Sequence, residues 1–228
     1  MKENRFSGVR ACVFDAYGTL FNVHSAVARH QARLGGLADG VSALWRTKQL
    51  EYTWLRTMMG RYVDFWQVTG DALDFALETH RYEDPDLRQD LMEAYLALDC
   101  YSEVPEVLQA LREKGLKLAI LSNGSSDMLK AAVESAGLAE LLDASLSVDV
   151  LQCYKPMPAV YQMACDHLGV TAEEISFQSS NAWDAAGAAT FGMRVAWINR
   201  FKQRPERLPG RPAAELESLS DLPALMDD

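Results

Sequence analysis

The sequence has none of the long apolar runs or leader patterns that direct proteins to membranes, and it has no excess of basic residues. No apolar stretch approaches the roughly 18 residues that a membrane helix needs, and the first residues lead into no apolar signal core. The 228 residues carry a formal net charge of −10, whereas nucleic acids and anionic membranes bind basic surfaces. We therefore expect a cytoplasmic protein with no nucleic-acid partner and no membrane partner.

Cysteine is also scarce and is not arranged for metal binding. The four cysteines form no C-x-x-C pair, and no histidine cluster lies near them: Cys12, Cys100, Cys153 and Cys165. Zinc ligation and a disulfide framework are therefore poorly supported. Free thiols suit a reducing cytoplasm.

Short apolar strands alternate with helical segments over most of the chain. Strands are predicted at 9–14, 117–121, 144–148, 175–178 and 194–198, and helices at 105–114, from Ser125 to Ser135, and at 158–168, 181–191 and 220–226. Residues 200–212 are rich in proline and arginine and are predicted to form a loop. Alternating strands and helices indicate a parallel sheet with helices on both faces.

A helical block interrupts the first crossover of this pattern. Residues 23–98 show no strand pattern, and helices fit 43–59, 71–78 and 87–98. Because the block is too long for a loop, it is best interpreted as an inserted lobe. The predicted fold is α/β: a doubly wound, Rossmann-like parallel sheet core formed by 1–22 and 99–228, with an inserted helical cap lobe at 23–98.

Polar side chains follow four of the predicted strands. In chain order they are Asp15 and Thr19, Ser122 and Asn123, Tyr154 and Lys155, and then Ser179, Asn181 and Asp184. The carboxyl ends of parallel strands meet at one edge of a sheet, where open α/β proteins bind their ligands. A carboxylate there can attack an electrophilic carbon or phosphorus. Taken singly, each residue has a plain structural alternative, such as a turn, a cap or a solvated charge.

In combination these segments resemble a known superfamily. The segments Asp15-Ala16-Tyr17-Gly18-Thr19-Leu20, Ser122-Asn123-Gly124-Ser125, Tyr154-Lys155-Pro156 and Ser179-Ser180-Asn181-Ala182-Trp183-Asp184 resemble the four motifs of the haloacid dehalogenase superfamily. The likeness is closest to its L-2-haloacid dehalogenases, and residues 44–56 of this chain also resemble the cap of that family. The resemblance covers about residues 9–200 and implies a homodimer.

Tyr17 distinguishes between two activities of that superfamily. Its magnesium-dependent phosphatases have the pattern D-x-D at the first motif, with a second acid two residues after the first. This chain has Asp15-Ala16-Tyr17 there. Two carboxylates beside a lysine make a poor Mg²⁺ site, since hard dications prefer several carboxylate oxygens. We therefore expect neither a metal nor an organic cofactor. A magnesium-dependent small-molecule phosphatase stays the alternative, and a non-catalytic binding protein on the same fold is a second one.

The resemblance implies a two-step hydrolytic dehalogenation of a small-molecule 2-haloacid. Asp15 would attack C2 of an (S)-2-haloalkanoic acid, expelling halide and forming an ester. Water would then attack the Asp15 carboxyl carbon and release an (R)-2-hydroxyalkanoic acid. Lys155 would keep Asp15 ionised, because an adjacent cation favours the charged form.

The same resemblance assigns the other site residues. Arg46, Asn123 and Trp183 would cradle the halide. Ser122 and backbone N–H groups near Ala16, Tyr17 and Asn123 would bind the substrate carboxylate. Thr19 would steady Asp15, and Tyr161 would support Lys155 or the substrate. Ser179, Asn181 and Asp184 would position Lys155 and the water. An apolar pocket would be formed by Tyr17, Leu50, Phe65 and Trp183. His24, His30, His80 and His167 are assigned no catalytic role, and Trp45, Trp54 and Trp66 are assigned to packing or a subunit contact.

Overall fold

A parallel sheet forms the centre of the molecule in the computed structural model, which describes residues 6–226. Its order is β3-β2-β1-β4-β5-β6, and each neighbouring pair is parallel. The strands are β1 (Ala11–Phe14), β2 (Lys117–Ser122), β3 (Ala144–Ser147), β4 (Ile175–Ser179), β5 (Arg194–Ile198) and β6 (Ala214–Leu216). Because β1 is central and covered on both faces, all four of its residues are buried, as expected for a continuous apolar run in a parallel sheet.

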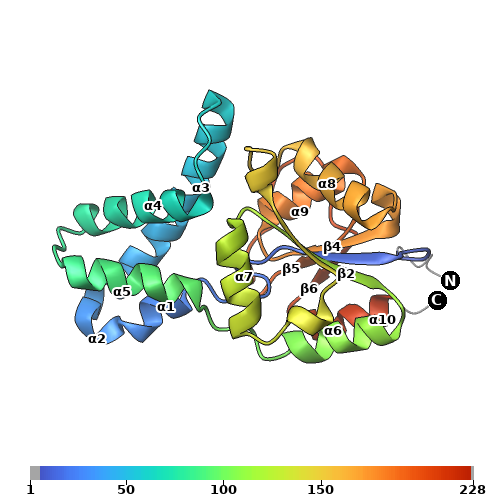
Figure 1. The fold of residues 1–228 in the computed structure, drawn as a ribbon, viewed down its shortest axis with the longest axis horizontal. Helices are drawn as coiled ribbons and strands as arrows, with labels where there is room; N and C mark the ends of the chain where they lie inside the picture. The colour runs from blue at the N-terminus through green and yellow to red at the C-terminus, as the bar shows by residue number, and fades with distance from the viewer. Residues whose placement is uncertain (1–5, 227–228) are drawn as a thin grey trace.

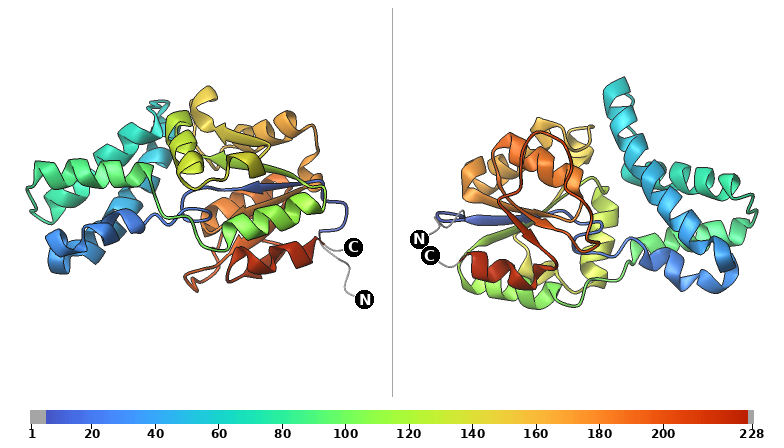
Figure 2. Two further views of the ribbon diagram at one scale, coloured as in Figure 1. Left: turned by 60° about the horizontal axis from the view of Figure 1, so that its bottom comes forward. Right: turned by 180° about the vertical axis from the view of Figure 1, so that it is seen from behind.

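Helices cover both faces of the sheet. Figure 1 shows α8 and α9 over one face and α6 and α10 over the other, and Figure 2 shows the same layers from two further sides. The helices of the core are α6 (Val104–Glu113), α7 (Ser126–Ser135), α8 (Pro158–Leu168), α9 (Ala182–Phe191) and α10 (Leu222–Leu225). Short 3-10 turns lie at Ala139–Leu141, Val148–Val150, Ala172–Glu174 and Leu219–Asp221. The predicted α/β class, with its Rossmann-like parallel sheet, is confirmed.

The inserted segment forms a helical lobe beside the sheet (Figure 1). It contains α1 (Ser25–Arg29), α2 (Gln31–Leu34), a 3-10 turn (Gly35–Leu37), α3 (Ala38–Met59), α4 (Phe65–Thr79) and α5 (Pro85–Leu96). Asp64 and Asp84 cap α4 and α5 by accepting bonds from backbone N–H groups, and the left-handed Gly60 ends α3. The far end of α3 projects away from the rest of the molecule (Figures 1 and 2).

The chain enters and leaves the lobe at one place. The backbone N–H of Asn22 donates to the carbonyl of Asp99 at 2.8 Å, and Phe21 forms an antiparallel bridge with Cys100. The two connecting segments therefore run side by side, and the helices of the lobe extend from this double connection.

Several element boundaries differ from the sequence predictions by a few residues, such as the start of α3 at Ala38 instead of residue 43, and two differences are larger. Strand β6 was not predicted, because Ala214–Leu216 is short, only partly buried and follows a proline-rich loop. Helix α4 begins at Phe65, well before the predicted start at Asp71, because Asp64 accepts a bond from the backbone N–H of Gln67 at 2.8 Å. Among the described residues, none of the helices has the length and apolar character needed to cross a membrane.

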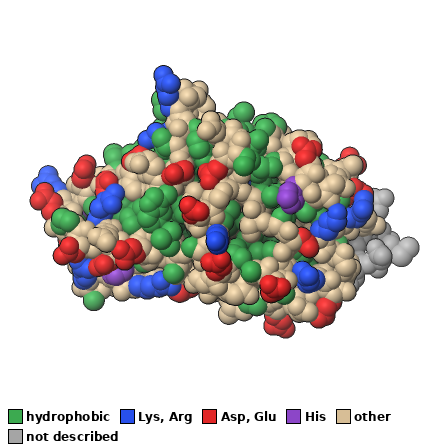
Figure 3. Space-filling model, in the orientation of Figure 1, with side chains coloured by type: hydrophobic (Ala, Val, Ile, Leu, Met, Phe, Trp, Pro, Cys, Tyr) green, Lys and Arg blue, Asp and Glu red, His purple; other side chains and the backbone are tan. Residues whose placement is uncertain are grey.

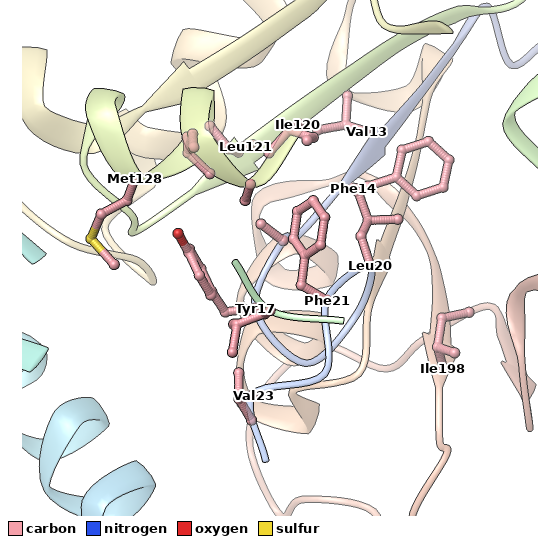
Figure 4. Packing of buried hydrophobic residues seen from close by; sticks show 14 of the residues in the cluster. Val13, Phe14, Tyr17, Leu20, Phe21, Val23, Ile120, Leu121, Met128 and Ile198 are labelled. Atoms are coloured by element: carbon pink, nitrogen blue, oxygen red, sulfur yellow. The ribbon is translucent and has the colours of Figure 1, made fainter. Parts of the chain in front are cut away.

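The apolar core continues from the sheet into the lobe. Figure 4 shows Val13 and Phe14 of β1 packed near Ile120 of β2, with Tyr17 and Phe21 in the turn that follows. On the face drawn in Figure 3, hydrophobic side chains also reach the surface over the lobe. The carboxyl end of β1 therefore lies where the two parts of the molecule meet.

Candidate active site

Asp15 lies immediately beyond β1, as predicted. Its backbone N–H donates to the carbonyl of Gln178 in β4 at 2.9 Å, which continues the ladder of the sheet by one residue. Its side chain is buried, with 6% of the residue exposed. The Thr19 hydroxyl donates to Asp15 Oδ2 at 3.1 Å, and Asn181 Nδ2 donates to the same oxygen at 2.8 Å. Two donors on one oxygen hold the carboxylate in a fixed orientation.

Lys155 bridges Asp15 and Asp184. Its Nζ lies 3.2 Å from Asp15 Oδ1 and 2.9 Å from Asp184 Oδ2, and only 1% of the residue is exposed. Burial by itself lowers the pKa of Lys155, but the two carboxylates together outweigh burial, so the pKa is raised. The ammonium group is therefore charged at neutral pH.

Asp184 is held by a second donor on its other oxygen. The Tyr161 hydroxyl donates to Asp184 Oδ1 at 2.8 Å, so Tyr161 reaches Lys155 through this carboxylate. Burial raises the pKa of Asp184; the charge of Lys155 opposes this, the negative charge of Asp15 adds to it, and the pKa is raised on balance. Burial likewise raises the pKa of Tyr161, which keeps the hydroxyl protonated and able to donate.

The ring of Tyr17 closes the site between the core and the lobe. It stacks on Tyr95 of α5 with ring centroids 5.6 Å apart, and its centroid lies 5.6 Å from that of Phe65 of α4. Figure 4 shows its hydroxyl directed toward α7, near Met128. A Cβ atom on Gly124 would lie 2.5 Å from Tyr17 Cε2, so the ring fits only because residue 124 is glycine.

Arg46 reaches the site from α3 of the lobe. Its Nη2 donates to Asn181 Oδ1 at 3.0 Å and to the carbonyl of Tyr17 at 3.3 Å, and its Nη1 donates to Gln49 Oε1 at 2.7 Å. Asn181 therefore links Arg46 to Asp15. A guanidinium in this place can bind an anion beside the carboxylate.

A cavity of about 500 Å³ opens beside Arg46. Predicted residues Arg46, Leu50, Asn181 and Trp183 line it, as does Thr47, a departure from the family pattern that was expected to affect substrate choice. Residues that were not predicted also line it: His24, Phe201, Gln203 and Glu206. Burial, followed by the charge of Arg46, lowers the pKa of His24, so this histidine is neutral in the cavity wall. The cavity provides the space for a small ligand between the lobe and the core.

Trp183 separates this cavity from a second, apolar groove. Its ring packs edge-on against Trp54 with centroids 5.2 Å apart, and the groove of about 420 Å³ beyond it reaches Lys155. Within residues 6–226, the buried Nε1 of Trp183 has no hydrogen-bond partner. It is therefore an unsatisfied donor on a residue that lines both spaces.

The remaining predicted residues lie around the same sheet edge. Asn123 Oδ1 accepts from the backbone N–H of Lys155 at 3.0 Å, Ser122 Oγ accepts from Gly124 N–H at 3.0 Å, and Ser179 Oγ accepts from Asn181 N–H at 3.1 Å. The carbonyl of Ala16 accepts bonds from the turn that follows it. Within residues 6–226, no three histidine, cysteine or acidic side chains gather where they could hold a metal ion.

Comparisons with known proteins agree with this geometry. The sequence profile of the haloacid dehalogenase-like hydrolases matches residues 9–192. The (S)-2-haloacid dehalogenase 1 of Pseudomonas sp. (strain CBS-3) is 49% identical over 219 residues, covering 96% of each chain. The chain therefore belongs to the haloacid dehalogenase-like hydrolase family.

Solved structures agree as well. A crystal structure of a dehalogenase has a TM-score of 0.95 at 48% identity, covering 97% of this chain and 99% of that one. The L-2-haloacid dehalogenase from Xanthobacter autotrophicus with chloropropionic acid covalently bound has a TM-score of 0.89 at 39% identity, covering 95% and 98%. The predicted likeness to L-2-haloacid dehalogenases is confirmed, and none of these relatives supports the phosphatase alternative.

Proposed function

We propose that this protein hydrolyses (S)-2-haloalkanoic acids to (R)-2-hydroxyalkanoic acids and halide. The observation that carries the proposal is the buried Asp15 carboxylate beside Lys155 at 3.2 Å, with Tyr17 in the place of a second acid. The names of the relatives support the substrate class, since similar proteins are called (S)-2-haloacid dehalogenases.

In the first step, an oxygen of Asp15 attacks C2 of the substrate from the side opposite the carbon–halogen bond. The bond breaks with its electron pair, which leaves as halide, and an ester joins Asp15 to C2 with inversion. Lys155 keeps the nucleophile ionised, and Thr19 and Asn181 hold its orientation. The chloropropionic acid bound covalently in the Xanthobacter relative supports a covalent intermediate.

In the second step, water attacks the carboxyl carbon of Asp15 and the 2-hydroxy acid leaves. Asp184 accepts one proton of this water, because it shares Lys155 with Asp15 and burial raises the pKa of its carboxyl. The other proton goes to the oxygen of the departing 2-hydroxy acid, and Asp184 then releases its proton to solvent. Ser179 and Asn181 position the water, and Tyr161 holds Asp184. The cleaved ester regenerates the free carboxylate of Asp15.

Two groups of residues bind the substrate. Arg46, Asn123 and the unpaired Nε1 of Trp183 hold the halogen as it becomes halide, because each offers a donor to an anion. Ser122 and the backbone N–H groups near Ala16, Tyr17 and Asn123 hold the substrate carboxylate. The apolar wall is formed by Tyr17, Leu50, Phe65 and Trp183, which exclude water and strengthen these interactions.

We propose further that residues 1–22 and 99–228 act as the core domain and 23–98 as a cap. The double connection at Asn22 and Asp99 supports these limits. No metal or organic cofactor takes part in the proposed reaction, since two carboxylates that share Lys155 make a poor site for a hard dication. A departing halide needs no proton, so Tyr17 can stand in the place of a second acid. The free cysteines support a cytoplasmic location.

A homodimer is the proposed assembly. The projecting end of α3 leaves Met58 and Met59 75% and 63% exposed, and Met58 also borders the apolar groove with Met157 and Leu208. Apolar side chains gathered in this way favour burial against a second copy. Light scattering tests this assembly, and Met58→Lys should shift a dimer toward monomer.

Halide release tests the proposed activity directly. The protein should release chloride from (S)-2-chloropropionate and not from the (R) enantiomer, and the product should be (R)-lactate. The Asp15→Asn variant should release none. Hydrolysis of p-nitrophenyl phosphate with Mg²⁺, without halide release from any haloacid, would instead support the phosphatase alternative.

A further inference from the structure

A buried glutamine in the lobe holds the guanidinium of Arg46. Gln49 is 1% exposed and lies on the apolar face of α3 that also carries Val41, Trp45 and Thr53. Its Oε1 accepts from Arg46 Nη1 at 2.7 Å and from the Tyr95 hydroxyl at 3.1 Å. A buried polar side chain at such a position is costly unless it is hydrogen-bonded, and both polar atoms of this amide have partners.

The amide nitrogen of Gln49 is fixed as firmly as its oxygen. Nε2 donates to Thr69 Oγ1 at 2.8 Å, and the Thr69 hydroxyl donates onward to the carbonyl of Phe65 at 2.6 Å. The Trp45 indole also donates to the carbonyl of Thr69 at 2.9 Å. Gln49 is therefore held by α4 through Thr69 and by α5 through Tyr95, which leaves its oxygen only one orientation toward Arg46.

The charge of Arg46 is not neutralised by this arrangement. Within residues 6–226, its guanidinium donates to neutral oxygens, those of Gln49, Asn181 and Tyr17, and the neutral Tyr95 hydroxyl also interacts with it. A glutamate at 49 would accept the same bond but would cancel the positive charge at contact distance. A neutral acceptor aims the guanidinium and leaves its charge for an anion.

We propose that Gln49 is a positioning residue that directs Arg46 toward the anionic ligand while keeping its charge uncompensated. The inference rests on the proposed role of Arg46 in halide binding. The relay from Thr69 through Gln49 to Arg46 makes halide affinity depend on how the lobe helices α3, α4 and α5 pack together. Within residues 6–226, the side chain of Gln49 is hydrogen-bonded to Arg46, Thr69 and Tyr95 and to neither Asp15 nor Lys155.

Bromide affinity, measured by calorimetry, tests the proposal without requiring turnover. Gln49→Met and Gln49→Glu should each weaken bromide binding by about tenfold or more, the loss expected for a hydrogen bond to a charged group. The same variants should raise KM for (S)-2-chloropropionate more than they lower kcat. Thr53→Val is the matched control, since its buried hydroxyl bonds only within α3, to the carbonyl of Leu50. It should lower stability and leave bromide affinity unchanged.

A double-mutant cycle separates positioning from general loss of structure. Arg46→Lys should weaken bromide binding strongly in the natural chain and far less in the Gln49→Met background, because residues that act through one another are not additive. Full additivity, or wild-type bromide affinity in folded Gln49→Met, would overturn the proposal. Should that variant not fold, unchanged affinity in Gln49→Glu would overturn it equally.

Chloride release by the natural chain keeps the two proposals apart. If the natural chain releases chloride and the Gln49 variants bind bromide as tightly as it does, only the role of Gln49 is refuted. Bromide affinity that falls in the Gln49 variants without any chloride release would support that role and refute the proposed function. Equal bromide affinity in the natural chain and in Arg46→Lys would refute the halide role of Arg46 and, with it, the inference.

Discussion

Replacement of Lys155 by methionine tests the electrostatic core of the site. The substitution keeps the shape of the side chain and leaves Asp15 and Asp184 buried without their shared cation, which lies 3.2 and 2.9 Å from them. At an effective dielectric constant of about 20, a unit charge pair at this distance interacts by roughly 5 kcal/mol. Removing one partner of a buried pair costs about 3–5 kcal/mol, so the melting temperature should fall by roughly 6–20 °C.

The catalytic loss should exceed the loss that instability explains. Without the cation, the buried pair of carboxylates holds a proton more readily, and a protonated carboxyl can neither attack the substrate nor accept a proton from water. Chloride release at neutral pH should fall by at least about 100-fold, and the acid limb of the pH profile should move to higher pH.

A double variant separates the two effects. Lys155→Met combined with Asp184→Asn removes one uncompensated charge, so the melting temperature should recover in part while activity stays low. Near-normal chloride release by folded Lys155→Met would refute the role of the cation. Recovery of activity together with stability would show that the loss was one of folding alone.

Further predictions concern the metal, the alkaline range and the turn at Tyr17. Prolonged treatment with EDTA should leave chloride release unchanged, and activity that is lost and then restored by Mg²⁺ would contradict a metal-free reaction. Because the two carboxylates raise the pKa of Lys155, its charge persists above the usual lysine value of about 10.4, and kcat/KM should show no lysine titration between about pH 7 and pH 10. The same pair stabilises the fold fully below that value, and this stabilisation should be lost only as pH rises through the raised pKa. Gly124→Ala places a methyl group 2.5 Å from the Tyr17 ring and should raise KM and lower the melting temperature, since overpacking costs about 1–3 kcal/mol; unchanged values for both would show that the ring has room to move.

The sheet edge could be predicted from the sequence because strand ends in a parallel sheet converge. An apolar run followed by Asp15 is enough to place a carboxylate there, and Lys155 and Asp184 follow from the same rule. The contacts at 3.2 and 2.9 Å depend on the register of β1 between β2 and β4, which no local pattern encodes.

The lobe could be predicted only as a set of helices. Gln49 stands on the buried face of α3, one turn after Trp45. A glutamine at this spacing among apolar residues could have indicated a buried network, but none was predicted. Its partners Thr69 and Tyr95 lie on other helices, so hydrogen-bond geometry between them depends on how the helices cross. Strand β6 was missed for a related reason, since a three-residue strand carries no period of its own.

The origin of the product oxygen tests the central claim most directly. A single turnover with excess protein in oxygen-18 water should give a 2-hydroxy acid whose new hydroxyl carries ordinary oxygen, because that atom comes from Asp15. The peptide containing Asp15 should then carry one heavy oxygen, detected by mass spectrometry. Heavy oxygen in the product hydroxyl and none in Asp15 would show that water attacks the substrate directly, and the ester mechanism would be wrong.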